Sequence, residues 1–68
     1  MPISPIVSVL MTAYNREKYI AAAIESVLAS TLTDFELIIV DDGSRDRTVE
    51  IAKTYAAKDT RIKLYVNE

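Results

Sequence analysis

The sequence predicts an α/β domain in which three parallel strands alternate with two helices. Two short, uncharged runs rich in β-branched residues, 6–11 and 37–40, are typical of strands buried on both faces of a parallel sheet. After each run the apolar spacing becomes helical, and a short alternating run follows at 62–66. Because crossovers between parallel strands are right-handed, we expect a three-layer βαβαβ unit with the strand order 3-2-1, as in a Rossmann-like sheet.

The composition limits the kinds of site and partner that the protein can have. Half of the 68 residues are hydrophobic, so the chain can form a core, as one domain or part of one. Cysteine and histidine are absent, which excludes disulfides and thiolate metal sites and removes the most common general base. The net charge of -2 gives no electrostatic reason to expect a nucleic-acid partner.

Targeting and membrane signals are also missing from the sequence. Residues 1–5, with two prolines, form a lead-in that does not resemble a signal peptide. The apolar runs are far shorter than the roughly 18 residues of a transmembrane segment. We therefore expect a cytoplasmic location, with membrane association left open for a full-length protein.

The first strand and helix follow directly from the pattern. Residues 6–11 form the strand, residues 12–15 end it, and Asn15 is expected to cap a helix over about 16–30. The buried stripe of this helix has the spacing i, i+4, i+7 and i+8, with Ile20, Ile24, Val27 and Leu28. Residues 30–34 connect it to the next strand.

The second half repeats the unit. Residues 35–40 form a strand, residues 41–45 form its exit loop, and Asp46 is expected to cap a helix that ends near Lys58. The buried face of this helix comprises Val49, Ala52, Tyr55 and Ala56. The strand at 62–66 is more polar on one face, so we expect it near an edge of the sheet. The first strand is then an apolar edge, which predicts that more chain or a second copy covers it, as in a homo-oligomer.

Two loops should meet where ligands of parallel sheets bind, beyond the carboxyl ends of the strands. One offers Thr12, Tyr14 and Asn15; the other offers two carboxylates, the only glycine and a hydroxyl, at residues 41–44. An aromatic ring and carboxylates suit a nucleoside. Each side chain also has a structural alternative: Tyr14 as a core tyrosine, Asn15 as a helix cap, and either aspartate as an acceptor of backbone N–H groups.

Several details limit the possibilities at this edge. Pleat alternation sends Asp41 and Asp42 to opposite sides, so one of them is expected to face a ligand. Gly43 is expected to take a positive φ in the turn. A Walker A loop and a G-x-G-x-x-G loop are impossible with one glycine, which excludes these two phosphate-binding motifs. A nucleotidyltransferase is disfavoured because no glycine-rich loop follows the first strand.

At these spacings, the segments 7–15 (VSVLMTAYN), 19–20 (YI), 24–28 (IESVL) and 35–44 (FELIIVDDGS), with Asp46 and Thr48, resemble the N-terminus of family 2 glycosyltransferases. The resemblance implies a GT-A fold, a nucleotide-diphospho-sugar donor and inverting transfer, in pathways such as cell-wall or polysaccharide biosynthesis. The nucleotide-binding residues implied are Thr12, Tyr14, Asp41 and Asp42, with Tyr14 against the base, Asp42 hydrogen-bonded to the base, and Asp41 supporting the loop or sharing the contact. Residues implied to be structural in the loops are Asn15, Gly43, Ser44 and Asp46.

The same resemblance implies parts that this sequence does not contain. In the family a later D-x-D motif holds Mn²⁺ or Mg²⁺ on the donor diphosphate, and a general base follows; no Asp-x-Asp occurs here. We therefore interpret residues 1–68 as the N-terminal part of an incomplete GT-A domain, inactive alone, without catalytic or metal-binding residues, whose donor is expected to be a UDP-sugar. The alternative is a stand-alone, nucleotide-binding or self-associating half-domain without catalysis.

Overall fold

The computed structural model describes residues 7–30 and 34–67, so the expected lead-in and part of the first helix-to-strand connection lie outside the described residues. The elements alternate as expected: β1 (Val7–Ala13), α1 (Ile20–Leu28), β2 (Phe35–Asp41), α2 (Thr48–Lys58) and β3 (Ile62–Val66). The strands are parallel and lie in the order β1-β2-β3, which is the predicted 3-2-1 arrangement. The α/β class and the strand order are therefore confirmed.

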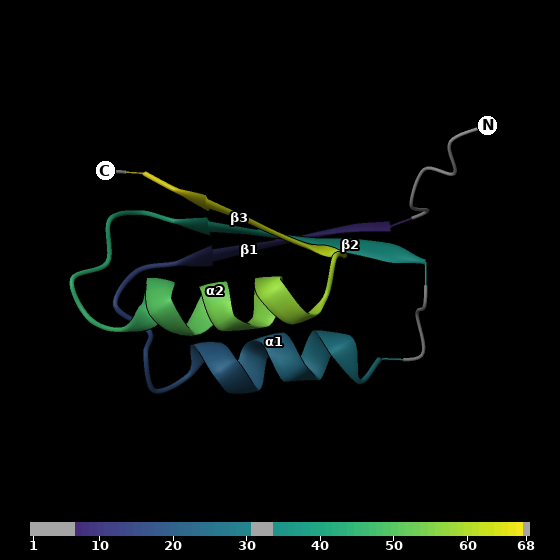
Figure 1. The fold of residues 1–68 in the computed structure, drawn as a ribbon, viewed down its shortest axis with the longest axis horizontal. Helices are drawn as coiled ribbons and strands as arrows, with labels where there is room; N and C mark the ends of the chain where they lie inside the picture. The colour runs from purple at the N-terminus through teal and green to yellow at the C-terminus, as the bar shows by residue number, and fades with distance from the viewer. Residues whose placement is uncertain (1–6, 31–33, 68) are drawn as a thin grey trace.

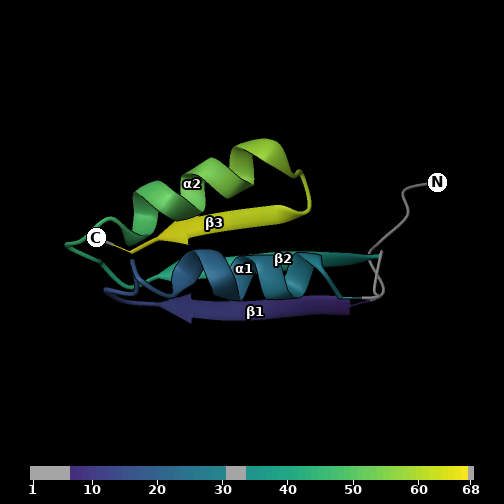
Figure 2. The ribbon, with the colours of Figure 1, turned by 90° about the horizontal axis from the view of Figure 1, so that it is seen from below.

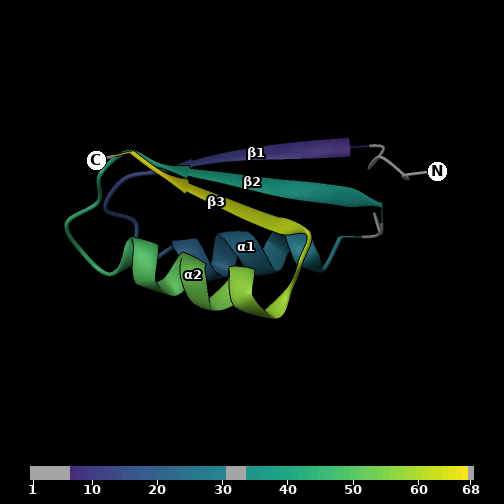
Figure 3. The ribbon, with the colours of Figure 1, turned by 45° about the horizontal axis from the view of Figure 1, so that its top comes forward.

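Both helices cover the same face of the sheet, as Figures 1, 2 and 3 show from three directions. The reason is the handedness of the crossovers. Each step from one strand to the next runs in the same direction across the sheet, so each right-handed connection places its helix on the same side. The described residues thus form two layers, and the third layer expected from the sequence is not among them.

The strands are buried on one face only, so the prediction of strands buried on both faces is wrong for the described residues. In β2, Leu37 and Ile39 are fully covered, whereas Ile38 and Val40 between them are half-buried. On the same open face, the side chain of Leu10 in β1 is 67% exposed. The sequence shows that the side chains on both faces of these strands are uncharged. It does not show whether another layer packs on each face of the sheet, and burial depends on that layer.

The core lies between the sheet and the helices. Its members are Ala13, Ile20, Ile24, Phe35, Leu37, Ile39, Ala52 and Ile62. The predicted stripe of α1 is confirmed, because Ile20 and Ile24 are buried and Val27 and Leu28 pack against the core. No helix within residues 7–30 and 34–67 has the length and apolar content needed to cross a membrane.

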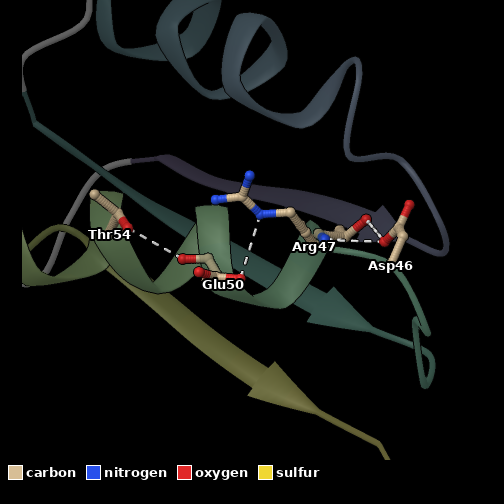
Figure 4. Close-up of polar contacts among 5 residues, drawn as sticks. Asp46, Arg47, Glu50 and Thr54 are labelled. Atoms are coloured by element: carbon tan, nitrogen blue, oxygen red, sulfur yellow. Dashed lines mark hydrogen bonds and ion pairs between the residues drawn. The ribbon is translucent and has the colours of Figure 1, made fainter.

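The two helix starts differ from each other. The first helix begins at Ile20 after a turn in which its N–H bonds to Arg16 O at 2.8 Å, so the prediction that Asn15 caps it is wrong. The second begins at Thr48, and its N-cap is Arg47, which makes no side-chain cap hydrogen bond. Asp46 lies one residue before the N-cap rather than at it, and its Oδ1 accepts the Thr48 N–H at 2.9 Å. Figure 4 shows Asp46 at this end of α2, ahead of the exposed ion pair between Arg47 and Glu50.

The turn between α2 and β3 is closed by Asp59 and Arg61. Arg61 donates from Nε and Nη2 to the two carboxylate oxygens of Asp59 at 3.0 and 2.8 Å, and its guanidinium lies 4.4 Å from the ring centroid of Phe35. The hydrogen bonds from the side chain and backbone of Arg61 lower the pKa of Asp59 from 3.8 to about 2. The carboxylate is therefore stabilised in its charged form.

This shift predicts a pH-dependent effect of Asp59→Asn. Because the pKa is lower in the folded state, the unfolded state binds the proton first, and the stabilisation is present above pH 3.8 and lost as the pH falls to about 2. In urea titrations, we expect Asp59→Asn to be less stable than the parent chain above pH 5, with a difference that narrows toward pH 2. Asp34→Asn controls for the change in net charge. A difference that is constant from pH 6 to pH 2 would contradict the lowered pKa.

Candidate functional site

Two loops meet at the carboxyl edge of the sheet. They follow β1 and β2, whose last residues, Ala13 and Asp41, are directly paired in the parallel register. The Asp42 N–H continues the pairing to Ala13 O at 2.9 Å. Asp42 therefore lies beside the backbone that joins Thr12 to Tyr14, and Figure 1 shows the two loops leaving the arrowheads of β1 and β2.

Asp41 is an internal acceptor that closes the second loop. Its side chain is 1% exposed, and its Oδ2 accepts the N–H groups of Gly43 and Ser44 at 3.0 and 2.7 Å. Its Oδ1 accepts the hydroxyl of Ser44. Gly43 has the expected positive φ, +83°, and a Cβ there would lie 3.3 Å from Asn67 O. The carboxylate of Asp41 is thus fully used within the loop, which supports its role in holding the loop.

The first loop is held to the second by a row of backbone donors. Three consecutive N–H groups of the first loop each donate to a side-chain oxygen that follows β2. The pairs are Asn15 with Ser44 Oγ at 2.8 Å, Arg16 with Thr48 Oγ1 at 2.7 Å, and Glu17 with Asp46 Oδ2 at 3.2 Å. In return, Asn15 Oδ1 accepts the Arg45 N–H at 2.8 Å. The polar residues after β2 therefore fix both loops as one unit.

The charge of Asp46 contributes to this unit. Partial burial acts to raise its pKa, but hydrogen bonds from the Thr48 hydroxyl, the Thr48 N–H and the Glu17 N–H outweigh it, so the pKa is lowered below the ordinary value. Asp46 is then ionised at neutral pH. Its negative charge lies at the start of α2, where the helix dipole favours an anion.

Three predicted site residues are not used in this framework. Asp42 and Thr12 are exposed, and Tyr14 is 51% exposed. Within residues 7–30 and 34–67, their side chains form none of the hydrogen bonds and ion pairs that hold the loops. Thr12 pairs with Val40 in the register and alternates with buried Ala13, so it lies on the face opposite the helices. A carboxylate, a hydroxyl and an aromatic ring are thus presented to solvent on a fixed loop pair.

The structure adds a hollow that the sequence did not indicate. It measures about 190 Å³ beside β1, and its lining residues are Met11, Thr12, Arg16, Tyr19, Ile20 and Ala23. Arg16 and Tyr19 were not predicted as site residues. Their approach to Thr12 depends on the turn that precedes α1.

The described residues do not fit a metal site. Among them, no group of three or more Asp or Glu side chains could hold a metal ion. The carboxylate of Asp41 already accepts three hydrogen bonds from Gly43 and Ser44, so of the two adjacent aspartates only Asp42 is exposed.

Comparison with known proteins decides the family. The family described as glycosyl transferase family 2 matches residues 8–68 of the chain. The chain belongs to this family. The match confirms the resemblance drawn from the sequence segments.

Curated proteins named as glycosyltransferases or as a chondroitin synthase are similar over nearly the whole chain. The putative glycosyltransferase EpsE of Bacillus subtilis is 49% identical over 65 residues, which is 94% of this chain and 23% of EpsE. The uncharacterized glycosyltransferase EpsJ of the same organism is 47% identical over 60 residues, 88% of this chain and 17% of EpsJ. Chondroitin synthase of Escherichia coli is 44% identical over 59 residues, 87% of this chain and 9% of that enzyme. The chain thus spans less than a quarter of the length of these relatives.

A solved glycosyltransferase shares the fold. The mannosyltransferase PcManGT of Pyrobaculum calidifontis, determined in complex with GDP-Man and Mn²⁺, superimposes with a TM-score of 0.77 at 22% sequence identity. The match covers 97% of this chain and 20% of that enzyme. The family 2 chain therefore has the arrangement of strands and helices found in a glycosyltransferase domain.

Proposed function

We propose that this family 2 chain is the nucleoside-binding part of an inverting glycosyltransferase, which transfers a sugar from a nucleotide-diphospho-sugar to an acceptor hydroxyl. The observation that carries the proposal is the contrast between two adjacent aspartates. Asp41 is buried and saturated by Gly43 and Ser44, whereas Asp42 is exposed next to the backbone between Thr12 and Tyr14. One carboxylate builds the loop and leaves the other available for a ligand.

The chemistry of each group fits a nucleoside. The exposed Tyr14 ring offers a surface on which a base can stack, and the Thr12 hydroxyl offers a hydrogen bond to the nucleoside. The Asp42 carboxylate is an acceptor only, so it suits a base with an N–H on its pairing edge. Uracil carries such a donor at N3, whereas cytosine carries a lone pair at N3 and donates only from its N4 amino group, so a carboxylate placed opposite N3 distinguishes the two bases. This favours the UDP-sugar expected from the sequence, with GDP as the corresponding purine nucleotide.

The remaining chemistry belongs to parts of a longer protein. Neither the general base nor the Mn²⁺ or Mg²⁺ implied for a full-length enzyme is assigned to a residue of this chain, and these residues alone are proposed to be inactive. A bound divalent ion supplies charge neutralisation of the leaving diphosphate. The similarity to a chondroitin synthase supports a role in polysaccharide synthesis. The cytoplasmic location stays a prediction.

Titration with UDP in the absence of metal tests the nucleoside site. We expect saturable amide shifts confined to the loops after β1 and β2, and weaker binding of CDP because its N3 does not donate. Asp42→Asn should lower the affinity for UDP about tenfold, since a hydrogen bond to a charged acceptor exceeds a neutral one by about 1.4 kcal/mol. Isothermal calorimetry or the shifts themselves give the dissociation constant.

Asp34→Asn is the matched control, because it makes the same charge change at an exposed position before β2, at the opposite edge of the sheet. It should bind UDP as the parent chain does. Equal affinities of Asp42→Asn and Asp34→Asn would show that Asp42 does not contact the nucleotide. The absence of any shift with UDP or GDP would leave the alternative, a half-domain that folds or self-associates without nucleotide.

A further inference from the structure

We propose that Asn15 is a positioning residue for the nucleotide, setting the spacing between the Tyr14 ring and the Asp42 carboxylate. The inference rests on the proposed function and extends it to a residue that contacts protein rather than ligand. Asn15 directly follows Tyr14, and it contacts Ser44 and Arg45, which follow Asp42. Besides the hydrogen bond from the Asp42 N–H to Ala13 O, it therefore provides a connection between the segments that carry the two exposed groups.

The backbone of Asn15 has an uncommon conformation. Its φ is +52°, and within residues 7–30 and 34–67 it is the one non-glycine residue with a positive φ. Asparagine adopts this left-handed region with less strain than most residues. The chain turns there immediately after Tyr14, so the conformation of residue 15 directs where the preceding ring lies.

The turn is locked by two hydrogen bonds of opposite direction. Asn15 donates its N–H to Ser44 Oγ at 2.8 Å, and its side-chain Oδ1 accepts the Arg45 N–H at 2.8 Å. Ser44 is itself fixed because its hydroxyl and N–H bond to the buried Asp41. Because the left-handed turn is held to an anchored loop, it fixes the distance between the Tyr14 ring and the Asp42 carboxylate. A helix cap would fix only the end of a helix.

The adjacent bridges do not depend on the Asn15 side chain. Arg16 N–H bonds to Thr48 Oγ1 at 2.7 Å, and Glu17 N–H bonds to Asp46 Oδ2 at 3.2 Å. These contacts hold the rest of the first loop to the start of α2. Loss of the Asn15 amide should therefore loosen the Tyr14 side of the loop while the fold is retained, which separates positioning from folding.

Asn15→Gly makes the required change, since glycine accepts the positive φ and keeps the N–H but removes the acceptor for Arg45. We expect its affinity for UDP to fall about fivefold, the equivalent of one ordinary hydrogen bond of about 1 kcal/mol. We also expect the ratio of UDP to CDP affinity to decrease, because a displaced Tyr14 ring holds the base less accurately against the Asp42 carboxylate. Amide exchange at Arg45 should become faster.

Two further variants separate positioning from general stability. Asn15→Asp keeps an acceptor oxygen and tolerates the left-handed region, so it should preserve the ratio of UDP to CDP affinity. Its added negative charge should weaken the binding of both nucleotides. Tyr55→Phe removes the hydrogen bond to Glu25 between α2 and α1, far along the chain from the loops. It should lower stability without changing the affinity or the ratio.

The outcomes distinguish this inference from the proposed function. If the parent chain prefers UDP to CDP and Asn15→Gly keeps the same ratio, the positioning role is wrong and the nucleoside site stands. If Arg45 exchange is unchanged in Asn15→Gly, the side-chain hydrogen bond does not hold the loop and the inference is also wrong. If the parent chain binds neither UDP nor GDP, the proposed function fails and the positioning role falls with it.

Discussion

Asp41→Ala should unfold the protein or destabilise it by about 3 kcal/mol or more, whereas Asp42→Ala should leave its stability nearly unchanged. Asp41 is 1% exposed and accepts two N–H groups and a hydroxyl from Gly43 and Ser44. Its removal leaves these donors without their acceptor, and each buried unpaired group costs about 1–3 kcal/mol. A loss of that size is a large part of the stability of so small a domain.

The neighbouring aspartate provides an internal control for this prediction. Asp42 is exposed, so truncation to alanine should change the free energy of unfolding by no more than about 0.5 kcal/mol. Urea unfolding followed by circular dichroism measures both variants. Equal stabilities would mean that the buried hydrogen bonds of Asp41 do not support the loop, and the division of roles between the two carboxylates would fail.

The second large effect is expected at Ile39. Ile39→Ala should cost about 2–5 kcal/mol, because its side chain is fully buried between the sheet and the helices and the truncation leaves a cavity. Ile38→Ala, one residue earlier, should cost about 1 kcal/mol, because its side chain is half-buried on the open face. The two variants remove the same atoms from opposite faces of β2.

Thermal and urea unfolding of the two variants test which face carries the core. A loss at Ile38 as large as that at Ile39 would contradict an open face in solution and show that something covers it. The homo-oligomer expected from the apolar strand β1 stays a prediction. Within the described residues, β1 pairs on one side only, which leaves its outer edge available to a further strand.

The periodic parts of the chain could be predicted because their signals are local. Ile20 and Ile24 mark the buried side of α1 by their spacing, and the order of the strands follows from the handedness of short crossovers. The burial of both faces was predicted wrongly, because Ile38 and Ile39 are the same residue type and only their surroundings differ. The capping role of Asn15 was predicted wrongly for a related reason, since an asparagine before a helix fits both a cap and a left-handed turn.

By itself, the sequence determined the α/β order, the parallel strand arrangement, the family 2 motifs and the position of two carboxylates at the end of β2. Only the tertiary structure decided that Asp41 is internal, that Asp42 is presented to solvent, and that Asn15 joins the two loops. The physical reason is distance along the chain: the hydrogen-bond partners of Asn15 are Ser44 and Arg45, which are 29 and 30 residues away. A side chain that could form several different hydrogen bonds forms a particular one only when the fold brings that partner into contact with it.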